Sequence, residues 1–176
     1  MKRLWLLLPV IQAVMLVNPV QAASGCAAIS IMSNESLALG MLRTRPGAEG
    51  FFTLYPDNRM ASSGKGASHQ GTYGAGQVDI FGPPEARATL FVETAKQSDH
   101  DTGRLSLSEL RLSGTDEITT LEAQGGEVSV TFPARVDSQG RAKVDLRIGA
   151  VFRYRHGRGA FTSDYNVMID CIGVSE

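Results

Sequence analysis

Long hydrophobic runs are scarce in this sequence of 176 residues, and only one stands out. It extends from Leu4 to Val17 and follows the basic residues Lys2 and Arg3. The run has about 14 residues, fewer than the roughly 20 that a membrane-spanning helix needs. No later stretch reaches this length, so the sequence predicts no transmembrane segment in the mature chain.

The N-terminal run has the three parts of a secretory signal peptide. A basic start precedes the apolar run, Asn18 and Pro19 end it, and Val20–Ala22 places small residues where a signal peptidase cleaves. We therefore predict a signal peptide over residues 1–22 and a single mature domain over residues 23–176. The mature protein is expected in the periplasm, on the cell surface or outside the cell.

Cysteine is almost absent, because the chain has only two. Exported proteins meet an oxidising compartment, in which two lone cysteines tend to pair. Cleavage after Ala22 or Ala23 would leave both available, and we predict a disulfide between Cys26 and Cys171. The alternative is cleavage before Cys26 and a lipid anchor on that residue, which would leave Cys171 without a partner.

An excess of positive charge is also missing. The chain has 17 basic and 18 acidic residues, and the signal peptide contains two of the basic ones, Lys2 and Arg3. Affinity for nucleic acids rests on lysine and arginine side chains that neutralise phosphates. A mildly acidic domain without a basic cluster is therefore not expected to bind nucleic acid.

The sequence lacks the motifs of common enzymes and cofactor-binding proteins. It has no G-x-S-x-G motif, and Ser62–Gly66 lacks the first glycine of a phosphate-binding loop. Asp99, His100 and Asp101 form the most suggestive cluster, but neighbouring side chains on an extended chain point in opposite directions and cannot easily converge on one ion. We predict a non-enzymatic protein without a cofactor or a metal site.

Alternation of apolar and polar residues is the main pattern that the sequence does contain. It is clearest in Val144–Tyr154 and in Phe161–Cys171, which are separated by the glycine-rich stretch His156–Gly159. A period of two residues is typical of a strand with one buried face. The pattern predicts a β-hairpin of two long strands with a turn at these glycines.

Shorter alternating segments occupy much of the remaining chain. Turn-forming residues such as Pro56–Asn58 separate them, whereas the glycine- and serine-rich stretch Ser62–Gly76 predicts a mobile loop or an irregular sheet edge. The spacing favours an all-β fold, an immunoglobulin-like antiparallel β-sandwich of about eight strands. The expected short strands cover residues 29–32, 51–55, 86–92, 104–112 and 127–132.

Four segments, in order along the chain, share turn-based motifs with a known family. They are Leu39–Gly47, Tyr55–Gly64, Asp137–Gly149 and Gly159–Val167. Together they resemble the bacterial secreted domain-of-unknown-function family 4402, and the resemblance covers most of residues 37–170. It implies an immunoglobulin-like sandwich of the pilus and adhesin type without catalytic residues. The two cysteines are an addition to the family's pattern.

Two functions remain open at this point. The first is a structural or adhesive surface protein, such as a pilus-type subunit, in which the last strand borders a groove that a neighbouring subunit fills by strand addition. Cys26–Ser33 would itself have to be the donor in such an assembly, because few mature residues precede it. The alternative is a stand-alone module that binds a carbohydrate or a protein. The candidate contact residues are Arg153, Arg155, Arg158, Tyr73 and His100, although arginines at outward positions are also typical of a solvated strand face.

Overall fold

The computed structural model describes residues 25–96, 105–117 and 119–175, with the backbone alone for Lys96 and for residues 156–164. The predicted signal peptide therefore lies outside the described residues. Within these ranges, no helix has the length and apolar character needed to cross a membrane.

Every regular element in the described ranges is a β-strand, apart from one short 3₁₀ helix, η1 (Gly25–Ala28). This confirms the all-β fold class predicted from the sequence. The strands are β1 (Ser30–Glu35), β2 (Leu37–Leu54), β3 (Met60–Gln70), β4 (Gly76–Gly82), β5 (Arg87–Lys96), β6 (Leu105–Ser113), β7 (Thr119–Glu122), β8 (Gly126–Thr131) and β9 (Ala142–Ser175).

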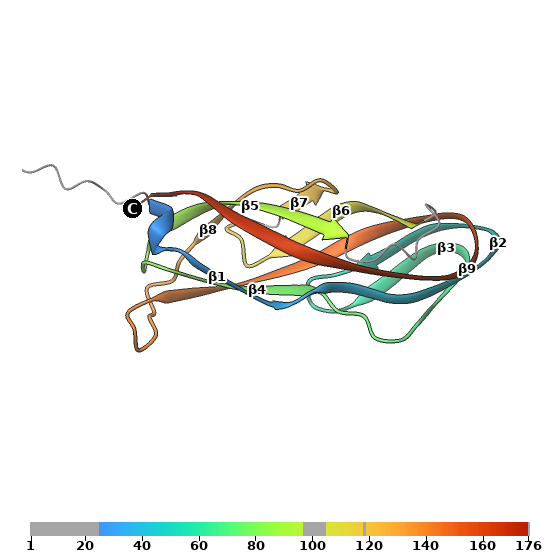
Figure 1. The fold of residues 1–176 in the computed structure, drawn as a ribbon, viewed down its shortest axis with the longest axis horizontal. Coiled ribbons are helices and arrows are strands. Elements are labelled where there is room, and N and C mark those ends of the chain that lie inside the picture. The colour runs from blue at the N-terminus through green and yellow to red at the C-terminus, as the bar shows by residue number, and fades with distance from the viewer. Residues whose placement is uncertain (1–24, 97–104, 118, 176) are drawn as a thin grey trace, which may run out of the picture.

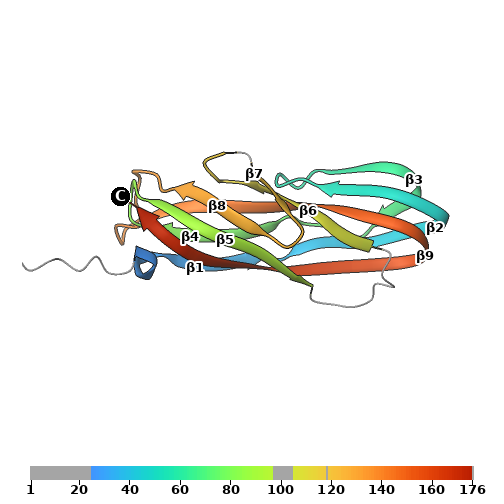
Figure 2. The ribbon, with the colours of Figure 1, turned by 90° about the horizontal axis from the view of Figure 1, so that it is seen from above.

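The strands form an antiparallel sandwich that is built around β9 (Figures 1 and 2). We name residues 142–155 of β9 its first arm and residues 165–175 its second arm. The first arm pairs with β4 and β6, and these two strands pair in turn with β1 and β7. The second arm pairs with β5, which pairs with β8. The sheet is open, with β1 and β3 at the two ends of its main path.

β9 has 34 residues and cannot be straight, because an extended strand of that length would measure about 110 Å. Lys143 pairs with Phe81, which pairs with Ser30, so the start of β9 lies close to the start of β1. Cys171 is bonded to Cys26, which places the end of β9 in the same region. β9 therefore runs to the far end of the molecule, reverses there and returns, as Figures 1 and 2 show.

β2 and β3 follow β9 around this reversal. The register of β2 with β9 shifts between the pairs Thr44–Gly159 and Ala48–Gly157. The register of β2 with β3 shifts at the same place. Gly47 lies within the shifted stretch of β2, and its φ of 76° is in the left-handed region, which glycine adopts without strain.

The reversal corrects the hairpin predicted from the sequence. The chain does turn back around the predicted glycines, Gly157 and Gly159. The two arms of β9, however, pair with β2 and with other strands, and no pair joins them to each other. The reason is that the second arm returns in the opposite layer of the sandwich instead of beside the first arm.

The core lies between the two layers and follows the predicted alternation. Along the first arm, Leu146, Ile148, Ala150 and Phe152 are fully buried, and the alternate positions Asp145 and Arg153 are exposed, although Val151 between them is buried as well. The ring centroids of Phe152 and Tyr165, from the two arms, lie 5.9 Å apart. Burying a large apolar side chain contributes about 1.5–3 kcal/mol, so this inward row stabilises the contact between the layers.

Four strands differ from the sequence-based expectation. Met60–Gln70 forms β3, so the prediction of a mobile loop is wrong for most of Ser62–Gly76, and the alternative of an irregular sheet edge is confirmed. β4 and β7 were not expected at all. Val78 and Ile80 alternate in β4, but flanking glycines and prolines obscure the pattern, and β7 has only four residues. β2 extends far beyond the short strand expected at its end.

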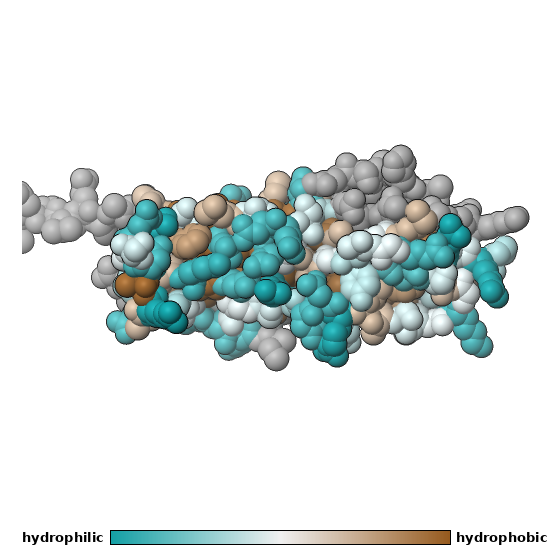
Figure 3. Space-filling view, turned by 90° about the horizontal axis from the view of Figure 1, so that it is seen from below, coloured by the Kyte–Doolittle hydropathy of each residue, from teal (hydrophilic) through white to brown (hydrophobic). Residues whose placement is uncertain are grey.

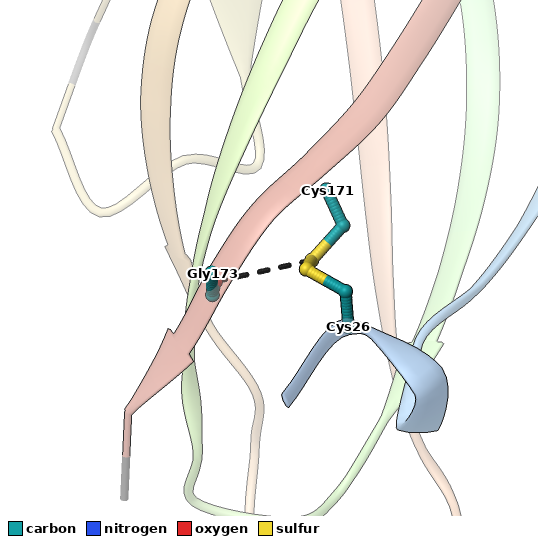
Figure 4. The surroundings of a disulfide bond; sticks show 3 residues. All are labelled: Cys26, Cys171 and Gly173. Atoms are coloured by element: carbon teal, nitrogen blue, oxygen red, sulfur yellow. Dashed lines mark hydrogen bonds between the residues drawn. A yellow bond between two sulfur atoms is a disulfide. The ribbon is translucent and has the colours of Figure 1, made fainter. Parts of the chain in front are cut away.

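The predicted disulfide is confirmed (Figure 4). Cys26 in η1 and Cys171 in β9 have Cα atoms 5.7 Å apart and are separated by 145 residues in the sequence. The Cys171 sulfur also lies 3.9 Å from the carbonyl oxygen of Gly173. The bond attaches η1, which otherwise has no strand partner, to the last part of β9.

The face of the molecule seen in Figure 3 is mostly hydrophilic, with its apolar residues in small, separate patches. The layer that contains the first arm of β9 is named the first layer. On it, Asp79 of β4 and Lys143 of β9 form an ion pair in which Nζ and Oδ2 are 2.7 Å apart. Burial alone would raise the pKa of the Asp79 carboxyl, but hydrogen bonds from Lys143 and Asn34 hold it below its ordinary value of 3.8.

Replacing both cysteines, Cys26→Ser and Cys171→Ser, should lower the free energy of unfolding by up to about 5 kcal/mol, because the bond closes nearly the whole described chain into a loop. Urea unfolding would measure the difference, and the unmodified protein under reducing conditions should match the double variant. Equal stability of the oxidised protein and the variant would contradict the expected contribution.

Asp79→Asn should destabilise the protein by about 1 kcal/mol at neutral pH, because it removes one partner of a hydrogen-bonded ion pair. The folded-state pKa of Asp79 is lowered, so its contribution is present above about pH 4 and is lost as the pH falls through that lowered value. Unfolding at pH 7 and pH 3 would test this. Asp145→Asn is the matched control, because both partners in the Asp145–Arg147 pair are 40% exposed and little change is expected.

Candidate functional site

The second arm of β9 has a strand partner on one side only. β2 pairs with β9 as far as Tyr165, which also pairs with Lys96 of β5. From residue 166 to residue 175, β9 pairs with β5, and none of the described strands pairs with its other side. Near the end, η1 packs beside β9, since a Cβ added to Gly25 would lie 2.8 Å from that of Val174. We name residues 166–170 the open edge.

Apolar side chains accompany this edge on both of its faces. Met168 and Ile172 are 42% and 52% exposed on the outer face. Ile169 and Cys171 are partly buried and pack against the core. Ile172 is the extra residue of a β-bulge, because the register with β5 shifts around it. The bulge and η1 therefore limit the unpaired stretch to a short segment before them.

The segment considered as a donor strand in the sequence analysis is already used within the molecule. Ser30–Ser33 pairs with β4 along its length, and Cys26 is held by the disulfide. In this structure, Cys26–Ser33 therefore acts as an edge strand and its anchor, and is not a free extension.

A second candidate site lies on the outer face of the first layer. Arg111 of β6 pairs with Thr120 of β7 on one side and with Gly149 of β9 on the other. Residues paired across strands share a face of the sheet, so these positions form a row. Tyr55 follows the end of β2 beside Gly149, and its N–H donates a hydrogen bond to the Arg59 carbonyl (2.8 Å). We name this series the outer row.

Gly149 lets the end of β2 cross close to β9. A Cβ on Gly149 would collide with the carbonyl oxygen of Leu54 and would lie 2.8 Å from the nitrogen of Pro56. Only glycine leaves room for this backbone approach. The missing side chain thus allows Tyr55 to lie next to Arg111.

A tight turn holds Tyr55 and Arg59 in place. The N–H of Asn58 donates to the Tyr55 carbonyl (3.0 Å), which confirms the turn predicted at Pro56–Asn58. Asn58 has a φ of 63°, a left-handed conformation that asparagine tolerates better than most residues. Its side-chain oxygen accepts a hydrogen bond from the N–H of Ala75 (2.7 Å), which fastens the turn to the segment before β4.

Two guanidinium groups lie over the Tyr55 ring. The distance from the ring centroid is 4.8 Å for Arg59 and 5.3 Å for Arg111. Arg59 Nε donates a 2.6 Å hydrogen bond to Asp57, and this bond holds the pKa of the Asp57 carboxyl below its ordinary value. Arg111 Nη2 lies 3.7 Å from Glu109, beyond hydrogen-bond distance. The two arginines therefore differ in how far their donors are used.

The outer row borders a cavity of about 440 Å³, a volume within the range of small-molecule sites. Most of its lining is apolar, and hydroxyl groups stand along one side. The lining residues are Tyr55, Pro56, Asp57, Arg59, Arg111, Leu112, Ser113, Thr119 and Thr120.

Three of the contact residues predicted from the sequence, Arg153, Arg155 and Tyr73, have described side chains, and these three do not form one cluster. Arg153 and Arg155 are exposed on the first arm, and the Arg153 guanidinium lies 5.7 Å from the Phe51 ring centroid. Tyr73 lies elsewhere, in the segment before β4, against His69 with ring centroids 5.0 Å apart. His100 and the side chain of Arg158 lie outside the described residues. Among the described candidates, the two arginines and Tyr73 therefore lie in different parts of the fold.

His69 of β3 makes contacts with two other segments of the chain. Its Nε2 donates a hydrogen bond to the carbonyl of Leu39, 2.8 Å away, and its ring makes an edge contact with Tyr73. These contacts connect β3 to β2 and to the segment before β4. They give both rings a structural role.

Sequence reasoning missed the outer row, because its members come from β2, β6, β7 and β9. Arg111 occupies an ordinary outward position in an alternating strand, and Gly149 interrupts another such strand. The one feature of the sequence that could have indicated this site is the aromatic residue Tyr55, which directly precedes the predicted turn Pro56–Asn58.

Comparisons of the chain with models of protein families, with curated proteins and with solved structures find no match. The resemblance to the secreted bacterial family therefore stays a prediction. In the described ranges, no group of three or more histidine, cysteine, aspartate or glutamate side chains is arranged to hold a metal ion.

Gly149→Ala should destabilise the protein by about 1–3 kcal/mol, because the added methyl group meets backbone atoms that cannot move aside easily. Gly173→Ala is the matched control in the same strand, since a Cβ there meets nothing within 4 Å. Thermal unfolding of both variants would measure the effect. Equal melting temperatures would show that the β2 crossing can shift at little cost.

Proposed function

We propose that this chain is an exported, non-enzymatic structural protein of the periplasm or cell surface, of the pilus or adhesin type. In this proposal, an extended segment of another polypeptide adds to the open edge of β9. The observation that carries the proposal is the one-sided pairing of residues 166–170, in a strand that is paired on both sides at Tyr165.

An unpaired strand edge offers a row of backbone donors and acceptors to another chain. In strand addition, these backbone groups provide affinity and the flanking side chains provide specificity. The exposed Met168 and the partly buried Ile169 supply apolar contacts on the two faces of such an added strand. The short length of the open edge and its single aspartate, Asp170, favour a specific partner over indiscriminate pairing.

The donor comes from another chain, because β1 is already paired with β4 and its upstream anchor is held at Cys26. Export of the protein is supported by the disulfide, which forms and persists in oxidising compartments. The absence of catalytic motifs from the sequence favours a structural role.

A photo-crosslinking residue at Met168, in protein produced by the exporting bacterium, would test the proposal. We expect crosslinks to one defined segment of another envelope protein. The same probe at Phe51 is the matched control, because Phe51 is 39% exposed but lies in a strand paired on both sides. Equal crosslinking at the two positions, or none at Met168, would contradict strand addition here.

Lysines at the exposed positions, Met168→Lys with Ile172→Lys, should reduce the crosslinked product about tenfold when the probe is placed at Asn166, because lysine protects strand edges from pairing. Both side chains are exposed, so the variant should keep the stability of the parent protein. An unchanged yield of crosslinked product would argue against an added strand.

A stand-alone binding module is the second candidate function. The cavity beside the outer row favours it, because this cavity combines apolar walls, hydroxyl groups and two guanidinium groups. The cavity lies on the outer face of the first layer, and the open edge belongs to the second arm of β9. Because the two sites are separate, one chain is able to carry both functions.

A further inference from the structure

The chemistry of the outer-row cavity identifies a class of ligand that the strand-addition proposal does not involve. The cavity lies on the outer face of β6 and β7, whereas the open edge belongs to the second arm of β9. Binding in this cavity therefore does not depend on strand addition at the open edge, and it specifies the ligand class of the second candidate function.

Arg111 is the cation with unused donors. A guanidinium group has five N–H donors, and the one ionic partner of Arg111 in the described chain, Glu109, is 3.7 Å away. The Arg111 Nε is buried without a hydrogen-bond partner among the described residues, and the side chain as a whole is 35% exposed. Arg111 also lines the cavity, so its partly exposed side chain lies where a ligand would bind. This arrangement favours an anionic group, which a guanidinium binds in a planar, two-point geometry.

Arg59 has a different role in the same cavity. Its Nε donates to Asp57 at 2.6 Å, and its guanidinium lies 4.8 Å from the Tyr55 ring centroid. The Asp57 carboxylate offsets the charge of Arg59, whereas Glu109 lies 3.7 Å from Arg111. We therefore assign the contact with the ligand to Arg111.

The rest of the lining is suited to a sugar. Ser113 and Thr120 provide hydroxyl groups that donate and accept hydrogen bonds, as sugar hydroxyls require, whereas the Thr119 hydroxyl already donates to the Glu117 carbonyl. Pro56 and Tyr55 also line the cavity and provide apolar surface for the C–H face of a ring. We propose that this cavity binds a carboxylated sugar, a uronic acid unit, whose carboxylate contacts the guanidinium of Arg111.

The test uses the purified full mature protein and titration with glucuronic and galacturonic acids. Glucose and galactose serve as the neutral counterparts, and inorganic phosphate as an anion without a sugar ring. We expect saturable binding of a uronic acid. The neutral sugars should bind at least about tenfold more weakly, because they lack the carboxylate that makes the charge-assisted contact. Phosphate should also bind at least about tenfold more weakly, because it has no ring to contact the apolar lining. Equal affinity for a neutral sugar or for phosphate, or no binding of either acid, would overturn the proposal.

Arg111→Gln should weaken uronic acid binding about tenfold or more, because it removes the charge and the planar pair of donors. Arg111→Lys keeps the charge and most of the stem, so it tests the donor geometry without removing the packing, and an intermediate loss is expected. Arg153→Gln is the matched control, since Arg153 is another outward arginine beside an aromatic ring but does not line this cavity. Equal losses for the Arg111 and Arg153 variants would show a general charge effect and would contradict the assigned site.

Discussion

The reversal of β9 is the constraint on which the other strands depend. Its two arms belong to opposite layers and pair directly with β2, β4, β5 and β6, and β2 and β3 pass around the same bend. One strand therefore sets the register of both layers. If each layer consisted of separate strands, only loops and side chains would hold one layer against the other. Here the two layers are joined directly, because the backbone of β9 passes from one layer to the other at the bend. The contact between Phe152 and Tyr165 then fixes the spacing of the arms.

The disulfide completes this arrangement at the opposite end. At the bend of β9, β2 and β3 bend with it. Near the end of β9, β5 pairs with one side of the strand, and no strand among the described residues pairs with the other side. η1 occupies part of that side and is held there by the Cys26–Cys171 bond. A short 3₁₀ helix without strand pairing has little stability of its own. The covalent bond therefore determines how much of the β9 edge is covered and how much is open.

The sequence predicted strands well and partners poorly, for a physical reason. Alternation in Val144–Tyr154 reports which face of a strand is buried, and the buried row in the structure agrees with it. Alternation does not report which strand lies beside it, so the glycines at the bend were assigned to a hairpin. The cysteine pair was predictable because only one pairing was possible. β4 was missed because glycines and prolines flank its short alternation, and β3 because its exposed glycines and serines bury nothing.

The outer row shows why a site of this kind is hidden in a sequence. Each member has an ordinary explanation in its own strand: Arg111 as an outward side chain, Gly149 as a weak point in a strand, and Tyr55 as the residue before a turn. Their combination depends on the register of β6 with β9, which follows from the reversal of β9 and not from any local pattern. Two guanidinium groups close to one ring repel each other, and Asp57 and Glu109 offset this repulsion from exposed positions. Since Asp57 lies 2.6 Å from Arg59 and Glu109 lies 3.7 Å from Arg111, the less compensated positive charge is that of Arg111, which lines the cavity.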